Sequence, residues 1–226
     1  MKVGTEQQII DSWHKNAKPW IRAVREGEIE SRLFVTNKAI VDTVLQRKPK
    51  TVLDIGCGEG WLVRKLTKHG IDVLGIDVVP ELLESASRDN TGRFQTMAYE
   101  DISADALKQK FDVAVCNFSL LGKKSVEHVF QQVPTVLNAG GAFIVQTLHP
   151  VVACGDQPYR DGWRQGSWAG CNDVFGNPPP WYFRTLESWE SLFMHNGLHL
   201  TQIAEPIHPK TRLLVSVVFV GEVAGK

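Results

Sequence analysis

The sequence predicts an α/β fold with a mostly parallel, seven-stranded sheet and helices on both faces. Strand-like and helix-like segments alternate between residues 51 and 149, a pattern typical of right-handed βαβ units. Two further strand-like runs, 198–204 and 212–220, are joined through Pro206 and Pro209. That short link predicts an antiparallel C-terminal hairpin at the edge of the sheet.

The N-terminal segment, residues 1–48, is expected to form a helical cap, because apolar residues recur there at three- and four-residue steps. In the core, residues 51–149, strands are expected at 51–55, 71–77, 93–97, 111–117 and 142–148. Helices are expected at 61–69, 81–87 and 126–137. Pro80 suits the first turn of the second helix, and the run NAGG at 138–141 stops the third.

Residues 150–184 are rich in Gly, Pro and aromatic side chains and show little periodicity. A loop of this length inside a compact domain is usually functional, so we expect an insert that forms a flap over an apolar substrate pocket. The alternative is a small core that packs the loop onto the sheet. Residues 185–226 complete the chain with a helix at about 186–196 and the hairpin.

The overall composition fits one domain spanning residues 1–226. Lys plus Arg and Asp plus Glu each number 25, so the formal net charge is zero. Nucleic acid and anionic membrane both attract an excess of basic residues. We therefore expect a small-molecule substrate and neither of those partners, although the aromatic and Arg residues of the insert would also suit single-stranded nucleic acid. The oligomeric state is left open.

The four cysteines form no CxxC pair and have no histidine at a metal-ligand spacing, so no metal site is expected. The N-terminal residues lack the apolar core of a signal peptide, and no apolar stretch has membrane-spanning length. These observations predict a cytoplasmic protein with reduced cysteines.

The chemistry centres on the turn that runs from Asp54 to Gly60 (DIGCGEG). Glycines at alternate positions allow a tight turn and a close approach by a ligand, and the following helix presents free N–H groups. Asp54 would repel a phosphate but attract an ammonium group, which favours a ligand with an amino-acid end. Asp54 could instead cap the helix.

Asp77 ends the second strand, where an acidic side chain can accept hydrogen bonds from a ribose diol. Both nicotinamide and adenosyl cofactors carry such a ribose. A plain surface position is the alternative for Asp77. The ordered set of glycine turn, acidic strand end, FDVAVCN strand and closing hairpin is more specific than the glycine turn alone.

Four segments resemble the class I, Rossmann-like S-adenosylmethionine-dependent methyltransferases of the small-molecule type, a broad group that includes quinone-biosynthesis C-methyltransferases. They are VLDIGCGEG (52–60), VLGIDVVPELLESA (73–86), FDVAVCNFSLL (111–121) and LNAGGAFIVQTLHP (137–150). The resemblance covers about residues 51–220. It implies methyl transfer from S-adenosyl-L-methionine to a small organic acceptor.

The resemblance also implies the cofactor contacts. Asp54 would lie near the amino group, and Asp77 would bind the ribose. The remaining expected contacts are Gly56, Cys57, Gly58 and Gly60 of the turn, Val78 on the adenine, Tyr99 and Glu100 at the adenine edge, and Asn117 and Phe118 beside the methionine and sulfonium. Relatives often carry an Asp close after the third strand where this chain reads Met-Ala-Tyr-Glu, so Tyr99, Glu100 and Asp101 all remain candidates for the adenine amino group.

Some of these residues have a second, structural interpretation. Cys57 also fits a small buried residue, and Phe118 also fits the core. Trp13 and Trp20 would pack a helix over the sheet or cover the cofactor mouth. His149, at the end of the fifth strand, is the candidate general base, although a lone His is more often structural. Two other functions remain: an NAD(P)-dependent oxidoreductase, which Asp54 opposes, and a non-catalytic S-adenosylmethionine-binding module.

Overall fold

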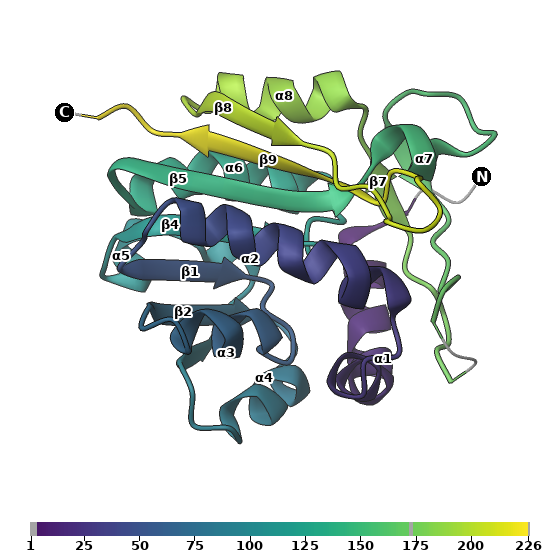
Figure 1. Ribbon diagram of the computed structural model, residues 1–226, viewed down its shortest axis with the longest axis horizontal. Helices are drawn as coiled ribbons and strands as arrows, with labels where there is room; N and C mark the ends of the chain where they lie inside the picture. The colour runs from purple at the N-terminus through teal and green to yellow at the C-terminus, as the bar shows by residue number, and fades with distance from the viewer. Residues whose placement is uncertain (1–3, 172–173, 226) are drawn as a thin grey trace.

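The computed structural model describes residues 4–171 and 174–225, so residues 172 and 173 of the expected flap lie outside the described part. Its seven-stranded sheet consists of β1 (Thr51–Ile55), β2 (Asp72–Asp77), β3 (Arg93–Thr96), β4 (Phe111–Asn117), β5 (Leu137–Leu148), β8 (His199–Ala204) and β9 (Ser216–Glu222). The strand order is β3-β2-β1-β4-β5-β9-β8 (Figure 1). The five strands from β3 to β5 are parallel, and β9 is antiparallel to both of its neighbours. The mostly parallel seven-stranded sheet is confirmed.

Helices cover both faces of this sheet, as expected. They are α1 (Glu6–Arg25), η1 (Arg32–Thr36), α2 (Asn37–Gln46), α3 (Trp61–Thr67), α4 (Pro80–Ser87), η2 (Tyr99–Asp101), α5 (Ala104–Leu107), α6 (Lys124–Val136), α7 (Pro150–Cys154) and α8 (Leu186–His195). Successive strand residues point to opposite faces. Val52 therefore packs with α2 and α3, while Leu53 packs with α6 and α8.

The C-terminal hairpin pairs as expected and lies at the edge of the sheet. β9 lies between β5 and β8, so β8 is the outer strand of the hairpin. The physical reason for this order lies in the residues themselves. Val217–Val220 are fully buried, as suits a strand covered on both faces, whereas β8 is largely exposed. The connection is longer than expected, with an isolated bridge between Ile207 and Leu214.

Two local expectations about the segments around β5 are also corrected. β5 begins at Leu137, directly after α6, so the run NAGG lies within the strand and does not form a separate helix stop. The insert at 150–184 contains α7 and a two-stranded antiparallel sheet of β6 (Gly162–Arg164) and β7 (Trp181–Phe183). The sequence gives no periodic signal for these short strands. They are held by contacts between residues distant in the chain, such as the Arg164 guanidinium, which stacks 3.4 Å from the centroid of the Phe183 ring.

The helix α1 lies at the carboxyl ends of the parallel strands, on the right of Figure 1. Thr5 and Gln8 form a capping box that begins the helix. Farther along, Ala17 is fully buried in a cluster with Val79 and Leu82. The N-terminal part of the chain therefore closes the end of the sheet at which ligands of open α/β folds bind.

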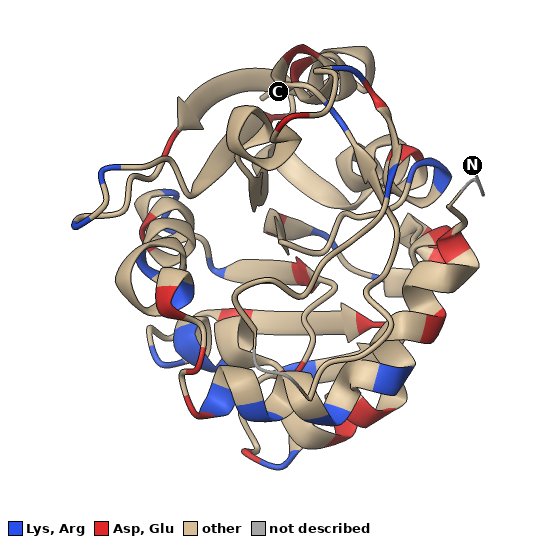
Figure 2. Ribbon diagram, turned by 90° about the vertical axis from the view of Figure 1, so that its right-hand side faces the viewer, with Lys and Arg blue, Asp and Glu red and all other residues tan. Residues whose placement is uncertain are grey.

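Figure 2 views that end of the molecule, where Lys, Arg, Asp and Glu are interspersed around the rim and the loops across the centre are mostly uncharged. Within residues 4–171 and 174–225, no helix combines the length and the apolar character needed to cross a membrane.

Candidate active site

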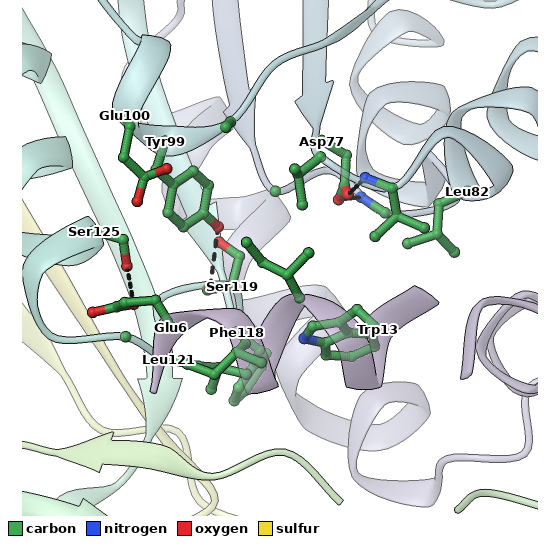
Figure 3. Close-up of a pocket in the computed structure, with 18 of the residues that line it drawn as sticks. Glu6, Trp13, Asp77, Leu82, Tyr99, Glu100, Phe118, Ser119, Leu121 and Ser125 are labelled. Carbon is green, nitrogen blue, oxygen red and sulfur yellow. Dashed lines mark hydrogen bonds between the residues drawn. The ribbon is translucent and has the colours of Figure 1, made fainter. Parts of the chain in front are cut away.

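A cavity of about 120 Å³ lies at the carboxyl ends of the central strands (Figure 3). Four strand ends supply one side of its lining, and α1 supplies the other. The strand-end residues are Gly56, Gly58, Asp77, Val78, Val79, Ala98, Tyr99, Glu100, Asn117, Phe118 and Ser119, and those of α1 are Glu6, Ile9, Ile10, Trp13 and Trp20. The structure thus brings together residues that are far apart in the sequence.

The glycine turn has the backbone conformation that the sequence predicts. Gly56, Gly58 and Gly60 have φ angles of 73°, 57° and 79°, a region that other residues rarely adopt. A Cβ at Gly56 would lie 2.4 Å from the Cβ of Ser119. Gly56 and Gly58 line the cavity, whereas a Cβ at Gly60 would face Ala86 of α4, outside the lining.

Asp77 ties the end of β2 to the glycine turn. Its Oδ2 accepts a hydrogen bond of 2.9 Å from the Gly58 N–H, and its Oδ1 accepts one of 2.9 Å from the Val79 N–H. Burial raises the pKa of Asp77, and these hydrogen bonds partly oppose the rise. A carboxylate offers about four lone-pair sites, so Asp77 retains acceptor capacity on the cavity side. The alternative interpretation of Asp77 as a plain surface residue is wrong, because Asp77 is only 8% exposed.

Asp54 is buried behind the cavity lining, and its Oδ2 has no hydrogen-bond partner. Burial, with a smaller contribution from the Asp77 carboxylate, raises the pKa of Asp54 to about 8. The alternative role of Asp54 as a helix cap is wrong, because Gly60 occupies the N-cap of α3 and no side chain caps it. The Oδ1 of Asn117, which lines the cavity, is likewise without a partner. Such orphaned oxygens are costly unless a ligand donor reaches them.

The residues after β3 show which side chains face the cavity. Tyr99 and Glu100 line it and Asp101 does not. The Tyr99 hydroxyl donates a hydrogen bond of 3.0 Å to the Ser119 carbonyl. Burial raises the pKa of Tyr99 well above 10, so this phenol is neutral at ordinary pH.

Phe118, after β4, lines the cavity with a φ of 55°. A bulky residue in the left-handed region is a genuine outlier, and such strain is found preferentially at functional sites. Phe118 therefore lines the cavity and is not only a core residue; its contact with the cofactor stays a prediction. By contrast, the Cys57 side chain packs into the apolar cluster that includes Val63 and Leu83, away from the lining, because the turn directs it toward Gly75.

The structure does not bring His149 to this cavity. His149 is 2% exposed, and its Nε2 lies 2.8 Å from Oε1 of Glu205. It sits at the N-cap position of α7. His149 follows β5, as expected, but its side chain contacts Glu205, which follows β8.

Sequence reasoning named Trp13 and Trp20 as a possible cover but missed Glu6, Ile9 and Ile10. The two Glu6 oxygens accept hydrogen bonds from the N–H groups of Lys123 and Lys124 and from the Ser125 hydroxyl at 2.7–2.8 Å. These contacts span more than a hundred residues, so no local signal reveals them.

The insert touches the cavity walls from outside. Asn16 of α1 exchanges two hydrogen bonds with the main chain of Gly176, and Trp168 packs edge-on against Trp13. The Tyr182 N–H donates to the Leu121 carbonyl after β4. Among the described residues of 150–184, none lines the cavity; α1 occupies the place in which the sequence suggested an aromatic flap.

Comparison with known proteins decides the family. A family model described as a methyltransferase domain matches residues 29–203. The chain belongs to this methyltransferase family. Its fold is that of class I S-adenosylmethionine-dependent methyltransferases, which supports S-adenosylmethionine as the cofactor. The nicotinamide alternative is not supported.

Similar proteins agree with this assignment. Over 113 residues, the methyltransferase is 34% identical to a ubiquinone biosynthesis O-methyltransferase of Paraburkholderia phymatum, a match that covers 48% of this chain and 49% of the relative. The chain thus spans about half the length of the curated relatives it matches.

Two solved structures share the fold. A Listeria monocytogenes protein described as a putative S-adenosylmethionine-dependent methyltransferase has a TM-score of 0.63 at 22% identity, covering 77% of this chain and 91% of that one. The 1,6-didemethyltoxoflavin-N1-methyltransferase of Burkholderia thailandensis has a TM-score of 0.66 at 15% identity, covering 99% and 92%. In the described part of this methyltransferase, no three His, Cys, Asp or Glu side chains gather to hold a metal ion.

Proposed function

We propose that this protein transfers the methyl group of S-adenosylmethionine to a small organic acceptor that is neutral or cationic. The observation that carries this proposal is the charge of the cavity. Among its described lining residues, the charged side chains are the carboxylates Glu6, Asp77 and Glu100. A negative cavity attracts a cationic cofactor and repels an anionic acceptor.

The residues present fit the cofactor. The orphaned oxygens of Asp54 and Asn117 suit its ammonium group, since buried acceptors without partners favour a charged donor. Asp77 has acceptor capacity for the ribose hydroxyls. Val78, Tyr99 and Glu100 also line the cavity and offer the apolar wall and polar edge that an adenine needs. The aromatic face of Phe118 suits the sulfonium.

When bound, the cofactor supplies an electrophilic methyl group with a good leaving group. The chain's own task is alignment and exclusion of water. Ile9, Ile10 and Trp13 of α1 close the cavity with apolar surface. Tyr99 is held neutral and already donates to Ser119, so it is not a base. A proton lost by a hydroxyl or amine acceptor therefore passes to a lining carboxylate or to solvent.

Two relatives favour a small acceptor. One is named for an O-methylation in ubiquinone biosynthesis, and the other for N1-methylation of a toxoflavin precursor. Their names cover two acceptor atoms, so we leave O and N methylation open. We also infer a cytoplasmic location, which the four unpaired cysteines support.

A labelling experiment tests the proposal. The protein is incubated with methyl-labelled S-adenosylmethionine and matched panels of phenols, amines and carboxylates, and transferred label is counted. We expect label on members of the neutral or cationic panels. Label confined to carboxylates, or S-adenosylmethionine binding without transfer to any panel, contradicts the proposal. Asp77→Asn, with Asp72→Asn on the same strand as its exposed control, ties the activity to the cavity.

A further inference from the structure

The cavity is too small for the cofactor that we assign to it. Its volume is about 120 Å³, whereas sites for ligands of this kind occupy roughly 300–1,000 Å³. One wall must therefore move. The strand-end wall is fixed by the sheet and by the hydrogen bonds of Asp77, so the movable wall is α1.

The two halves of α1 are held in different ways. Beyond Pro19, Ala23 is buried, and the Arg25 guanidinium donates to Glu59, Asp89 and the Ser85 carbonyl at 2.9–3.0 Å. Glu59 is itself fully buried. Removing a partner from the buried Glu59 carboxylate is costly, so the C-terminal half is an anchor.

Before Pro19, α1 packs on Val79 and Leu82 through the buried Ala17, close to the proline. Toward its N-terminus it is held by polar contacts at its end and flank. Glu6 accepts hydrogen bonds from the N–H groups of Lys123 and Lys124 at the start of α6. It also accepts one from the Ser125 hydroxyl (Figure 3). The N-cap residue of α6 makes no side-chain cap of its own, so Glu6 supplies the cap from another helix. Asn16 and Ser12 bond to the main chain of Gly176 and Asn177, so this loop is expected to move with the helix.

Pro19 lies between these halves, inside α1. Proline has no N–H to donate to the carbonyl of Lys15, which removes a hydrogen bond from the helix at this point. Helices bend preferentially where such a bond is missing. The sequence thus places a hinge between the anchored half and the half that covers the cavity.

The opposite face of the covering half has space beside it. A second cavity of about 640 Å³ is lined by Gln8, Asp11 and Lys15 of α1 and, across from them, by Trp163 and Pro180 of the insert. Along α1, residues that line the first cavity alternate with residues that line the second, so the two cavities lie on different faces of the helix. The helix is therefore a partition with a small cavity on one side and a larger one on the other.

We propose that residues 6–18 of α1 are a lid that hinges at Pro19, opens toward the second cavity to admit ligands, and is latched by Glu6 on the first turn of α6. Glu6 acts here as a positioning residue, because both of its oxygens accept hydrogen bonds from the first turn of α6. This inference rests on the proposed function only for the identity of the ligand that the lid admits.

Amide hydrogen exchange of the ligand-free protein tests the latch directly. Glu6→Gln keeps the side-chain shape but removes the charge from its three hydrogen bonds. We expect exchange in residues 6–18 to accelerate about tenfold, while residues 20–25 change less than twofold. The matched control is Gln7→Ala, an exposed neighbour that bonds only to Asp11. Equal exchange in Glu6→Gln and Gln7→Ala overturns the proposal.

Binding kinetics test the hinge independently. The association rate of S-adenosylhomocysteine, followed through tryptophan fluorescence, should rise about tenfold in Glu6→Gln, because the open state is more populated. It should fall in Pro19→Ala, which restores the missing backbone hydrogen bond. Unchanged rates in both variants contradict the lid. A chain that shows the exchange difference but binds no S-adenosylhomocysteine contradicts the proposed function and leaves the latch supported.

Discussion

Asp77 accepts a hydrogen bond of 2.9 Å from the backbone N–H of Gly58, which joins the end of β2 to the glycine turn after β1. The second oxygen of Asp77 accepts from Val79. One carboxylate thus fixes two segments of main chain at the cavity while remaining part of its lining. The same side chain is both a structural clamp and a candidate ligand for the cofactor ribose, so its replacement should affect stability and binding together.

Asp77→Asn tests this double role. The amide presents an N–H₂ group to one of two backbone donors, so one hydrogen bond is replaced by a repulsive contact. We expect a loss of about 2 kcal/mol in unfolding free energy and a fall of at least about tenfold in affinity for S-adenosylhomocysteine, measured by chemical denaturation and calorimetry. Asp72→Asn is the control, because Asp72 lies on the same strand in an exposed pair with Arg93, and such pairs contribute little. Equal effects in the two variants would contradict the clamp.

Gly56→Ala should be far more damaging than Gly70→Ala. Both glycines have positive φ, 73° and 79°. An alanine at either position therefore lowers the unfolding free energy by about 1 kcal/mol through backbone strain. Only at Gly56 would the new Cβ meet Ser119 and the Tyr99 hydroxyl at 2.4–2.5 Å. We expect an additional loss of roughly 2 kcal/mol at Gly56. Similar unfolding free energies for the two variants would show that the turn relaxes around the clash.

Much of this site was predictable because its residues are local to strand ends. Gly56, Gly58 and Asp77 follow strands whose apolar runs are plain in the sequence, and parallel strands bring their carboxyl ends together. The side-chain directions were not predictable. Cys57 and Gly60 belong to the same turn but face the core and α4.

The covering wall could not be predicted, because it depends on contacts that are distant in the chain. The spacing in α1 predicts a helix but does not say what it packs against. The hydrogen bond from the Lys123 N–H to Glu6 of this helix joins residues 117 positions apart in the chain. The order of the last two strands had a readable signal: Val217–Val220 are apolar without alternation, as expected of an interior strand.

Cofactor affinity should depend on pH through Asp54. Its pKa in the free protein is about 8, so Asp54 carries a proton at pH 6–7. An ammonium group favours the ionised form, and binding should therefore release that proton. We expect the dissociation constant for S-adenosylhomocysteine to fall as pH rises from 6 to 8, by up to about tenfold per pH unit, and to level off above 8.

The control for this dependence is Asp54→Asn, which cannot titrate and should bind weakly with a flat profile. The same raised pKa also predicts how the unfolding free energy of the free protein depends on pH. The folded pKa is raised above the unfolded value of about 4, so Asp54 in the free protein lowers stability as pH rises from about 4 to 8. Calorimetry in buffers of different ionisation enthalpy measures the released proton. If no proton is released on binding at pH 7, Asp54 is ruled out as the ammonium partner.

His149→Gln should leave turnover unchanged, because His149 is outside the cavity lining. The replacement disturbs a partly buried contact of 2.8 Å with Glu205, and we expect a loss of about 1 kcal/mol in unfolding free energy. Initial rates at saturating acceptor and a denaturation curve measure the two effects. A large fall in turnover with an unchanged Michaelis constant would restore His149 as a general base.

The central claim is that the cavity at the strand ends holds an adenosyl cofactor with an amino-acid tail. Thermal unfolding in the presence of S-adenosylhomocysteine or NADH tests it most directly. A ligand at a hundred times its dissociation constant stabilises the folded state by about 2.7 kcal/mol, which raises the melting temperature of a chain of this length by roughly 5–10 °C. We predict this rise with S-adenosylhomocysteine, its loss in Asp77→Asn, and no rise with NADH. A rise with NADH alone would contradict the account.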